Sequence, residues 1–461
     1  MTNKDAKAMS WMNEDQTATK VLKYLFTQCE PIYCRSVAPL QDTPSIKSTY
    51  QANVTVKDPY VVKMSGKELP KTPNAITNTT TYHFYQDTKI PSYLLAIAVG
   101  NLAEKKIGDQ YSRSSVISEP GAQYLDRYAD ELSELDDLLN ATEAWMTPYI
   151  WEKYTILILP PSFPFGGMEN PLLTFASPTI IVGDKSQVYV ATHEIAHSWT
   201  GNDVTCRDWS NLWLNEGFTV FEERKVSEEK HGTDFALREA QLGNVSLWID
   251  MQNFGLNNSY SALYPVMNGA NPDDSFSNVP YEKGFQFITY LESLMKNKTD
   301  FQKLIRGYVN QHTLTSITYI ELKAYFEKWI GDNYTPEEVQ TIKDAIDWEE
   351  WVKQGGKNPD KAKLNFTTTG AVQFETLADE YIRLNGNSSP DNFNIYIQAT
   401  DPQLRVIFLN RLLEKISQVN LAIVKKIDSD LSITSAANPE IGQRWFPLAI
   451  TAKYDWGINA A

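Results

Sequence analysis

The stretch VATHEIAHSWTGN, residues 190–202, places His193 and His197 four positions apart, with Glu194 directly after the first histidine. On an α-helix, side chains at positions i and i+4 lie one above the other on the same face. Both imidazole rings could therefore offer a nitrogen to one tetrahedral zinc ion. Glu194, next to that face, could take a proton from an attacking water molecule. Two histidines on a buried helix face are the alternative, and this stretch alone leaves both interpretations open.

A catalytic zinc site needs three protein ligands and one open position, and Glu216 is the candidate for the third ligand. It stands 19 residues after His197, in LWLNEGFTV. A helix that ends near Asn202 and a second helix that begins near Asn211 would run antiparallel and bring Glu216 to the metal. Glu223 lies two turns further along the second helix, where it could accept a hydrogen bond from a ligand histidine and fix its tautomer. A solvated surface charge is an equal alternative for this last residue.

Length, charge and cysteine content limit the classes of protein and partner that fit the chain. With 461 residues, of which 42% are hydrophobic, the chain is long enough for two to four domains. A net charge of −15 repels nucleic-acid phosphates, so we expect no nucleic acid partner. We find no signal-peptide pattern, and no window approaches the roughly 18 apolar residues of a membrane span. We therefore expect no membrane insertion, a cytoplasmic location with the nucleus as a second compartment, and reduced thiols at Cys29, Cys34 and Cys206.

The pattern of hydrophobic residues predicts an α+β multidomain fold. Val, Thr, Tyr and Ile alternate with period two from about Ser48 to Ser118, which is typical of β-sheet. Amphipathic helical patterns dominate beyond Val188, and QGGKNPDKAK has the glycine, proline and polar residues of a linker. The helical patterns after it are compatible with stacked helical pairs. We divide the chain into an incomplete N-terminal β-domain (1–107), a mostly helical catalytic domain (108–353), a linker (354–368) and an incomplete C-terminal α-helical domain (369–461).

A second motif joins the histidines and makes the pattern specific. PPSFPFGGMEN, residues 160–170, contains Gly-x-Met-Glu-Asn, the exopeptidase motif of the gluzincin zinc aminopeptidases. Together with HEIAHSWTGN, LWLNEGFTV, GDKS and VPYEKG, it resembles the leukotriene A(4) hydrolase branch of that family. The resemblance runs from about Met9 to the C-terminus. It implies a thermolysin-like catalytic domain, a C-terminal helical-repeat domain, removal of N-terminal residues from peptides, and epoxide hydrolase activity on leukotriene-type fatty-acid epoxides.

Within this resemblance, Glu169 and Tyr281 take defined roles. Glu169 corresponds to the carboxylate that binds the substrate's free α-ammonium group, which it does by charge-assisted hydrogen bonds. Tyr281, in VPYEKG, matches the tyrosine whose phenol stabilises the oxyanion of the transition state. Without the resemblance, PFGGMENP would be interpreted as a turn and Tyr281 as one of 24 tyrosines. The resemblance also implies one zinc ion per chain, held by His193, His197 and Glu216.

The same resemblance places further residues along the substrate path. Gln28, with Cys29 and Glu30, matches a segment that lines the family's active site, and Glu30 stands where the branch usually has a second glutamine. Asp273 matches an acidic residue that serves the epoxide chemistry, and Phe276 stands where vertebrate members have a tyrosine. The remaining substrate-binding predictions belong to PPSFPFGGMEN and are Pro164, Phe165, Gly166, Gly167, Met168 and Asn170. The two glycines lack a Cβ, so their backbone could approach a substrate closely.

The two ends of the chain differ from the family's pattern. Family members begin with a longer β-domain, and they continue past KYDWGINAA through helices that carry an Arg-x-Lys pair for the substrate's carboxylate. We therefore expect a chain truncated at both ends, monomeric, with peptides and fatty-acid epoxides as substrates. Two alternatives stay open. One is a catalytically impaired relic or binding module, and the other is a thermolysin-like endopeptidase, which would have no need of Glu169.

Overall fold

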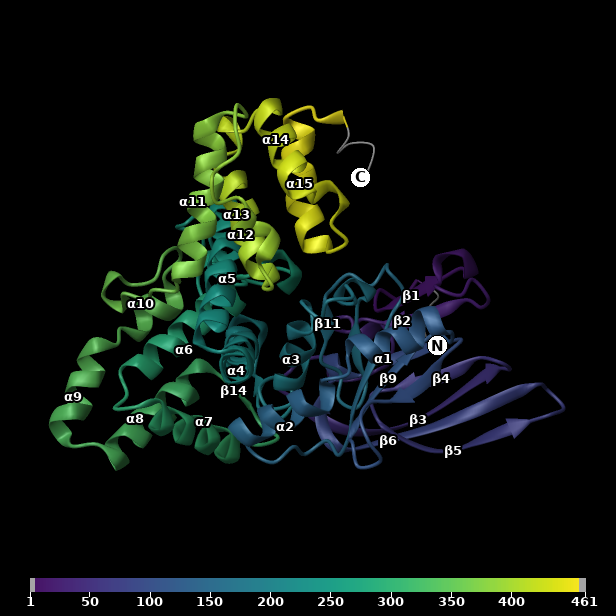
Figure 1. The fold of residues 1–461 in the computed structure, drawn as a ribbon. Helices are drawn as coiled ribbons and strands as arrows, with labels where there is room; N and C mark the ends of the chain where they lie inside the picture. The colour runs from purple at the N-terminus through teal and green to yellow at the C-terminus, as the bar shows by residue number, and fades with distance from the viewer. Residues whose placement is uncertain (1–4, 456–461) are drawn as a thin grey trace. The chain divides into compact units, whose positions relative to one another are not determined.

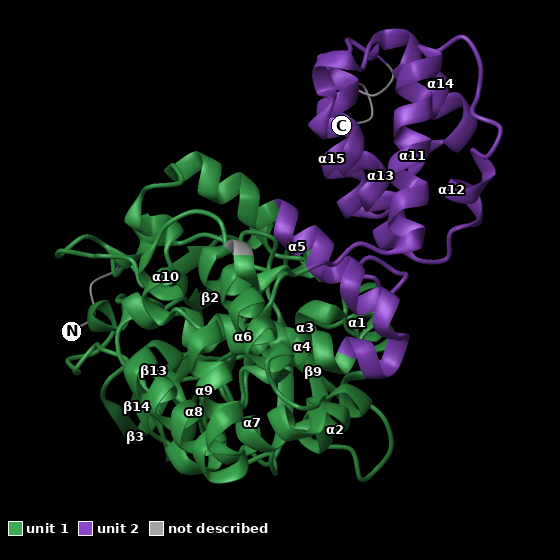
Figure 2. Ribbon diagram, turned by 90° about the vertical axis from the view of Figure 1, so that its left-hand side faces the viewer, with its two compact units in different colours: residues 1–181, 187–226, 246–364 green, residues 182–186, 227–245, 365–461 purple. Residues whose placement is uncertain are grey.

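The computed structural model describes residues 5–455, the side chain of Asp360 excepted. The chain forms two compact units, which are coloured separately in Figure 2. Unit 1 comprises residues 1–181, 187–226 and 246–364, and unit 2 comprises residues 182–186, 227–245 and 365–461. The predicted four-part division, whose first and last few residues lie outside the described range, stays a prediction.

The N-terminal part of unit 1 consists of two antiparallel sheets, as the period-two alternation predicts. The first has the order β1–β2–β7–β4, with β1 Met9–Met12, β2 Tyr24–Thr27, β7 Ile97–Gly100 and β4 Val61–Met64. The second has the order β3–β6–β5 and longer strands, with β3 Lys47–Lys57, β6 Thr79–Pro91 and β5 Lys67–Asn74 (Figure 1). Residues of both sheets share one buried core, which includes Leu25, Val62 and Phe84.

A third sheet carries the GGMEN motif at its edge. Its order is β11–β12–β10–β9–β8, and the bounds are β8 Ala103–Lys106, β9 Ser114–Ser118, β10 Tyr154–Ile158, β11 Gly167–Met168 and β12 Thr174–Ala176. The central strands run parallel, and β11 pairs antiparallel with β12, with Gly167 opposite Ala176. The motif is therefore a short edge strand, not the turn that its glycines alone indicate.

Two helices hold the candidate metal ligands, one in unit 1 and one that begins in unit 1 and continues into unit 2 from Ser227. They are α3 (Tyr189–Ala196) and α4 (Trp213–His231). The expectation that the first helix continues to about Asn202 is wrong. After Ala196 the chain closes in tight turns, and the amide N–H of Asn202 donates back to the carbonyl of His197 at 3.0 Å. Gly201 has a φ of +132°, which L-residues rarely adopt, so the helix cannot continue through it.

Further helices complete the two units. In unit 1 they are α1 Arg127–Glu131, α2 Leu135–Trp145, α6 Gly284–Ser293, α7 Lys298–His312, α8 Tyr319–Asn333, α9 Pro336–Ala345 and α10 Trp348–Lys353. Helix α5 (Thr233–Phe254) contributes residues to both units. Short strands β13 (Thr205–Cys206) and β14 (Ser316–Ile317) pair in parallel. Among residues 5–455, no helix is long and apolar enough to cross a membrane.

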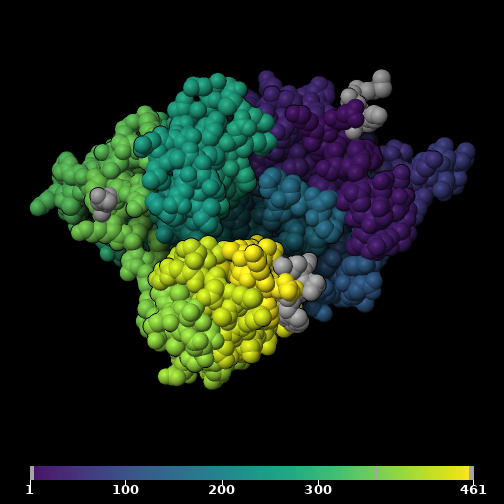
Figure 3. All heavy atoms as spheres, turned by 90° about the horizontal axis from the view of Figure 1, so that it is seen from above, coloured from purple at the N-terminus to yellow at the C-terminus, as the bar shows by residue number. Residues whose placement is uncertain are grey.

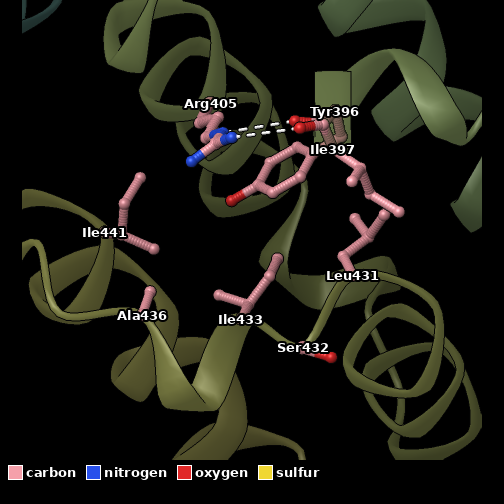
Figure 4. A pocket seen from close by; sticks show the side chains of 8 residues that line it. All are labelled: Tyr396, Ile397, Arg405, Leu431, Ser432, Ile433, Ala436 and Ile441. Carbon is pink, nitrogen blue, oxygen red and sulfur yellow. Dashed lines mark hydrogen bonds between the residues drawn. The ribbon is translucent and has the colours of Figure 1, made fainter. Parts of the chain in front are cut away.

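Unit 2 is helical, and together with the sheets and helices of unit 1 it confirms the predicted α+β multidomain fold. After residue 365 it contains α11 Thr369–Leu384, α12 Asn394–Gln398, α13 Pro402–Glu414, α14 Leu421–Leu431 and α15 Pro439–Thr451, which are the yellow and yellow-green part of Figure 3. Their core includes the fully buried Trp445, Phe408 and Leu377. A pocket of about 190 Å³ lies between these helices, lined by Tyr396, Ile397, Arg405, Leu431, Ser432, Ile433, Ala436 and Ile441 (Figure 4). The Arg405 side chain donates to the carbonyls of Tyr396 and Ile397, at the end of α12.

Candidate metal centre and active site

Helices α3 and α4 bring the three predicted metal ligands to one point. The Nε2 atoms of His193 and His197 lie 3.1 Å apart. The Oε2 atom of Glu216 lies 3.2 Å from the Nε2 of His197 and 3.5 Å from that of His193. Glu216 and His197 are almost fully buried. Helix α4 therefore brings Glu216 to the two histidines, as the sequence predicts.

The hydrogen bonds on the far side of each ring decide how the two histidines are protonated. The Nδ1 of His193 lies 2.9 Å from Oε2 of Glu223, and the Nδ1 of His197 lies 2.9 Å from the carbonyl oxygen of Thr200. Both partners are acceptors, so each neutral ring carries its proton on Nδ1. The two Nε2 lone pairs then face each other and the Glu216 carboxylate. Two imidazole nitrogens and one carboxylate oxygen are the donor set of a catalytic zinc site, so these residues fit the ion that the motif implies.

The side chain of Glu194 lies against the backbone of Gly167. Its side chain is buried, and its Oε2 has no hydrogen-bond partner among the described residues. A Cβ on Gly167 would lie 2.1 Å from Oε1 of Glu194. The sequence predicts that Gly167 makes room for a substrate, whereas the structure shows that it makes room for this carboxylate. Burial raises the pKa of Glu194 to about 8.

Glu169 and Glu216 are the other two buried acids of the site, and their pKa values shift in opposite directions. Burial also raises the pKa of Glu169. Burial would raise the pKa of Glu216 as well, but when the two rings are protonated, the charge of His197 and hydrogen bonds from both histidines lower it to about 2. Ionised Glu216 is the form that a metal requires of a carboxylate ligand.

The predicted amine-binding residues lie next to the candidate metal ligands. Ligand atoms of Glu169, Glu194 and His197 all lie within 4.8 Å of one another. The Oε1 of Glu169 is buried and has no partner in the described part of the chain, while its backbone carbonyl accepts a hydrogen bond from Asn202 Nδ2 at 2.8 Å. A buried carboxylate oxygen without a partner is costly, which fits a site for a cationic group. Glu169 is therefore fixed through its backbone, and Oε1 of its carboxylate has no partner among residues 5–455.

The segment from the β-sheet region contributes two of its three predicted residues to this site. Gln28 Nε2 donates to Met168 Sδ at 3.3 Å, which places the amide beside the GGMEN strand. Burial and the neighbouring charges of Glu169 and Glu216 raise the pKa of Glu30. Cys29, by contrast, is 3% exposed and packs in a core cluster with Ala8 and Cys34. Its thiol thus belongs to the core, as a small apolar side chain would, and not to the substrate path as predicted.

Tyr281 lies in a single π-helical turn, Val279–Lys283, directly before α6. Its ring stacks on that of His193, with centroids 5.9 Å apart and planes inclined by 24°. The next residue, Glu282, forms a buried ion pair with Arg224 of α4, at 2.7 and 2.9 Å. Arg224 follows Glu223 in the sequence. One short segment of α4 therefore contacts His193 through Glu223, and the turn that carries Tyr281 through Arg224.

The remaining predicted residues line the approach to the site or lie outside it. Asp273 is exposed and accepts a hydrogen bond from the hydroxyl of Tyr33. Phe276 is half exposed, and its ring contacts Tyr281 and Phe165 with centroid distances of 6.2 and 5.7 Å. Of the other motif residues, Pro164 and Gly166 are exposed, whereas Met168 and Asn170 are buried. Asp273 is thus engaged by the β-sheet region, a contact that the sequence does not predict.

Comparison with known proteins gives matches over nearly the whole chain. Residues 131–351 match the peptidase family M1 domain, and residues 10–94 match the peptidase M1 N-terminal domain. The chain is 35% identical to leukotriene A-4 hydrolase of Xenopus laevis over 460 residues, which is 99% of this chain and 73% of that protein. It is 33% identical to leucine aminopeptidase 2 of Neosartorya fischeri over 458 residues, or 98% of this chain and 71% of that protein.

Solved structures give the same result for the fold. The chain is similar to yeast LTA4 hydrolase in complex with bestatin, with a TM-score of 0.87 and 30% identity over 99% of this chain and 72% of that chain. It shares its fold with an M1 zinc metallopeptidase from Deinococcus radiodurans, with a TM-score of 0.56 and 22% identity over 73% of this chain and 71% of that chain.

Proposed function

This chain belongs to peptidase family M1, as a zinc aminopeptidase of the leukotriene A-4 hydrolase group, and we propose that it removes single residues from the N-terminus of peptides. The observation that carries the proposal is the position of the Glu169 carboxylate, whose Oε1 has no hydrogen-bond partner among the described residues, beside the cluster of His193, His197 and Glu216. An endopeptidase would not need an anionic group at this position, because its substrate has no ammonium group there. A non-catalytic binding module would not need Glu194.

We assign His193, His197 and Glu216 as the ligands of one zinc ion per chain. When bound, zinc supplies Lewis-acid polarisation of water and of the scissile carbonyl group. Glu223 orients His193 through the 2.9 Å hydrogen bond to its Nδ1. The carbonyl of Thr200 orients His197 in the same way.

Glu194 acts as the general base in this proposal. Its carboxylate takes a proton from the attacking water and passes it to the amine that leaves when the peptide bond breaks. The buried Oε2 without a partner gives the carboxylate an oxygen that can receive the proton. Gly167 leaves room for the carboxylate in this position, since a Cβ there would lie 2.1 Å from its Oε1.

Glu169 and Tyr281 contact the substrate at two points, the α-ammonium group and the scissile carbonyl group. Glu169 binds the α-ammonium group by charge-assisted hydrogen bonds, with Gln28 and Glu30 beside it. This anchor limits cleavage to the first peptide bond. The hydroxyl of Tyr281 donates to the oxyanion that forms at the carbonyl, and its stacking on His193 sets its position.

The direct test replaces Glu194 by Gln and measures hydrolysis of aminoacyl anilides together with zinc content. We expect bound zinc and a loss of turnover by several orders of magnitude, because the base is gone and the ligands remain. Retained turnover with zinc bound would contradict the assigned mechanism. One peptide offered with a free and with an acetylated N-terminus tests the exopeptidase assignment, and cleavage of the blocked form would favour an endopeptidase.

We propose hydrolysis of a fatty-acid epoxide as a second activity of the same site. The similarity to leukotriene A-4 hydrolase of Xenopus laevis supports it, as does the contact of Phe276, three residues after Asp273, with Tyr281. Incubation with a leukotriene-type epoxide and product analysis tests it, with Asp273→Asn as the variant that should lose diol formation and keep peptidase activity.

A monomeric state and a cytoplasmic location, with the nucleus as a second compartment, complete the proposal; sedimentation and cell fractionation test them.

A further inference from the structure

Glu222 is a buried acid that the peptidase mechanism leaves unused. Its side chain is fully buried in unit 1, on α4. Its Oε2 has no hydrogen-bond partner among the described residues. Burial of a carboxylate with one unsatisfied oxygen costs free energy that an apolar side chain at the same position would not. A polar residue in a core position is therefore a candidate for a functional role.

The other carboxylate oxygen of Glu222 ends a chain of hydrogen bonds that begins at His197. The Nδ1 of His197 lies 3.1 Å from Oγ1 of Thr219. That hydroxyl lies 2.8 Å from Oγ1 of Thr200. The Thr200 hydroxyl in turn donates to Oε1 of Glu222 at 3.3 Å. All four side chains are buried, so these hydrogen bonds are shielded from water.

The number of protons available gives this series of hydrogen bonds a direction, from His197 to Glu222. Each threonine hydroxyl can donate one hydrogen bond and accept others. The Nδ1–H of His197 must be a donor, because Nε2 faces the proposed metal. If Thr200 gives its proton to Glu222, its oxygen can accept from Thr219, and the oxygen of Thr219 can accept from His197. Every hydroxyl then donates once. The Nδ1–H of His197 is shared between Oγ1 of Thr219 and the carbonyl oxygen of Thr200, which lies 2.9 Å away, and the Thr219 hydroxyl also lies 2.9 Å from that carbonyl.

We propose that Glu222 is a positioning residue for the metal centre, which holds His197 in its metal-binding orientation through Thr200 and Thr219. The inference rests on the proposed role of His197 as a zinc ligand. Two neighbouring acids of α4 then each orient one of the two histidines. Glu223 acts on His193 by direct contact, and Glu222 acts on His197 through two hydroxyl groups.

The test compares zinc dissociation constants of full-length variants, measured by competition with a chromophoric chelator. Glu222→Leu removes the acceptor, and we expect zinc affinity about tenfold weaker, as for other partners of metal-binding histidines. Glu222→Gln keeps an amide oxygen that can accept from Thr200, and we expect it to restore affinity to within about threefold of the original chain. Thr219→Val breaks the chain at its middle. Glu222→Leu added to Thr219→Val should weaken affinity no further, because coupled residues are not additive.

Thermal unfolding of the metal-free proteins separates this role from a structural one. Glu222→Leu should not lower the melting temperature, since it removes an unsatisfied buried oxygen. Glu119 is the matched control, because its buried carboxylate accepts hydrogen bonds from Ala18 and Thr19, away from the site. Glu119→Leu, or Glu119→Gln if the first variant does not fold, should lower the melting temperature and leave zinc affinity unchanged.

Two sets of results would overturn the inference. Unchanged affinity in Glu222→Leu, or equal losses in the Leu and Gln variants, would show that the acceptor at this position does not orient His197. An additive loss in the double variant would show that Glu222 does not act through Thr219. Absence of zinc binding by the unchanged chain would instead contradict the proposed function itself.

Discussion

Substitution of Gly167 by Ala should damage catalysis while leaving the fold nearly intact. The added Cβ would lie 2.1, 2.4 and 2.7 Å from Oε1, Cδ and Cγ of Glu194. Ordinary contact begins at 3.4 Å, so the carboxylate must move by about 1.3 Å. The displaced atoms are the free end of one flexible side chain. The structure can therefore accommodate the methyl group by moving the proposed base instead of the backbone.

The displacement sets the expected size of the effect. A misplacement of about 1 Å in a reacting group can cost about 100-fold in rate. We therefore expect kcat/KM to fall about 100-fold, which corresponds to about 2.7 kcal/mol of transition-state stabilisation. The fall should appear in kcat and not in KM, because Glu194 acts on the water and not on substrate binding.

The assay is hydrolysis of an aminoacyl anilide, with zinc content and melting temperature measured on the same preparation. Gly331→Ala, in α8, is the matched control, because an added Cβ there would have no atom within 4 Å. That variant should keep its activity within about twofold, as expected of a substitution without a clash. Full activity in Gly167→Ala, or an equal loss in both variants, would refute the reasoning.

Four further results follow from the same contacts. Gly201→Ala should lose stability and zinc affinity, because φ is +132° and the Cβ would lie 2.8 Å from Nδ1 of His197; unfolding and chelator competition measure both. Arg224→Met should destabilise the protein by about 3–5 kcal/mol, because it leaves Glu282 buried without its cation, and Arg224→Met with Glu282→Leu should recover most of this loss in denaturant unfolding. Tyr281→Phe should lower kcat about 100-fold or more with little change in KM, which steady-state kinetics will show. Removal of zinc by a chelator should lower the melting temperature, and added zinc should restore it in a concentration-dependent way.

The candidate metal centre could be predicted from the sequence because its residues follow helix periodicity. His193 and His197 are one turn apart, and Glu216 and Glu223 are two turns apart, so each pair shares a helix face. The end of α3 could not be predicted in the same way. It depends on the positive φ of Gly201 and on the close approach of that residue to His197, neither of which has a sequence period.

Contacts between segments far apart in the chain could also not be predicted from the sequence. Gly167 and Glu194 touch because an edge strand of the third sheet passes over α3. Tyr33 reaches Asp273 from the β-sheet region, across more than half of the chain. Residue type alone indicated that Gly167 allows a close approach, but only the fold shows that the neighbour is the proposed base.

Helix geometry explains why one of the two neighbouring acids on α4 was predicted and the other was not. At about 100° per residue, Glu223 lies about 20° around the helix from Glu216, so both face the metal. Glu222 lies about 120° away from Glu216, on a face where periodicity predicts an apolar side chain. Thr219 lies about 60° from Glu216, halfway between the two faces. A carboxylate at position 222 is too far around the helix to touch a ligand histidine, so its effect on His197 passes through Thr200 and the side chain at position 219.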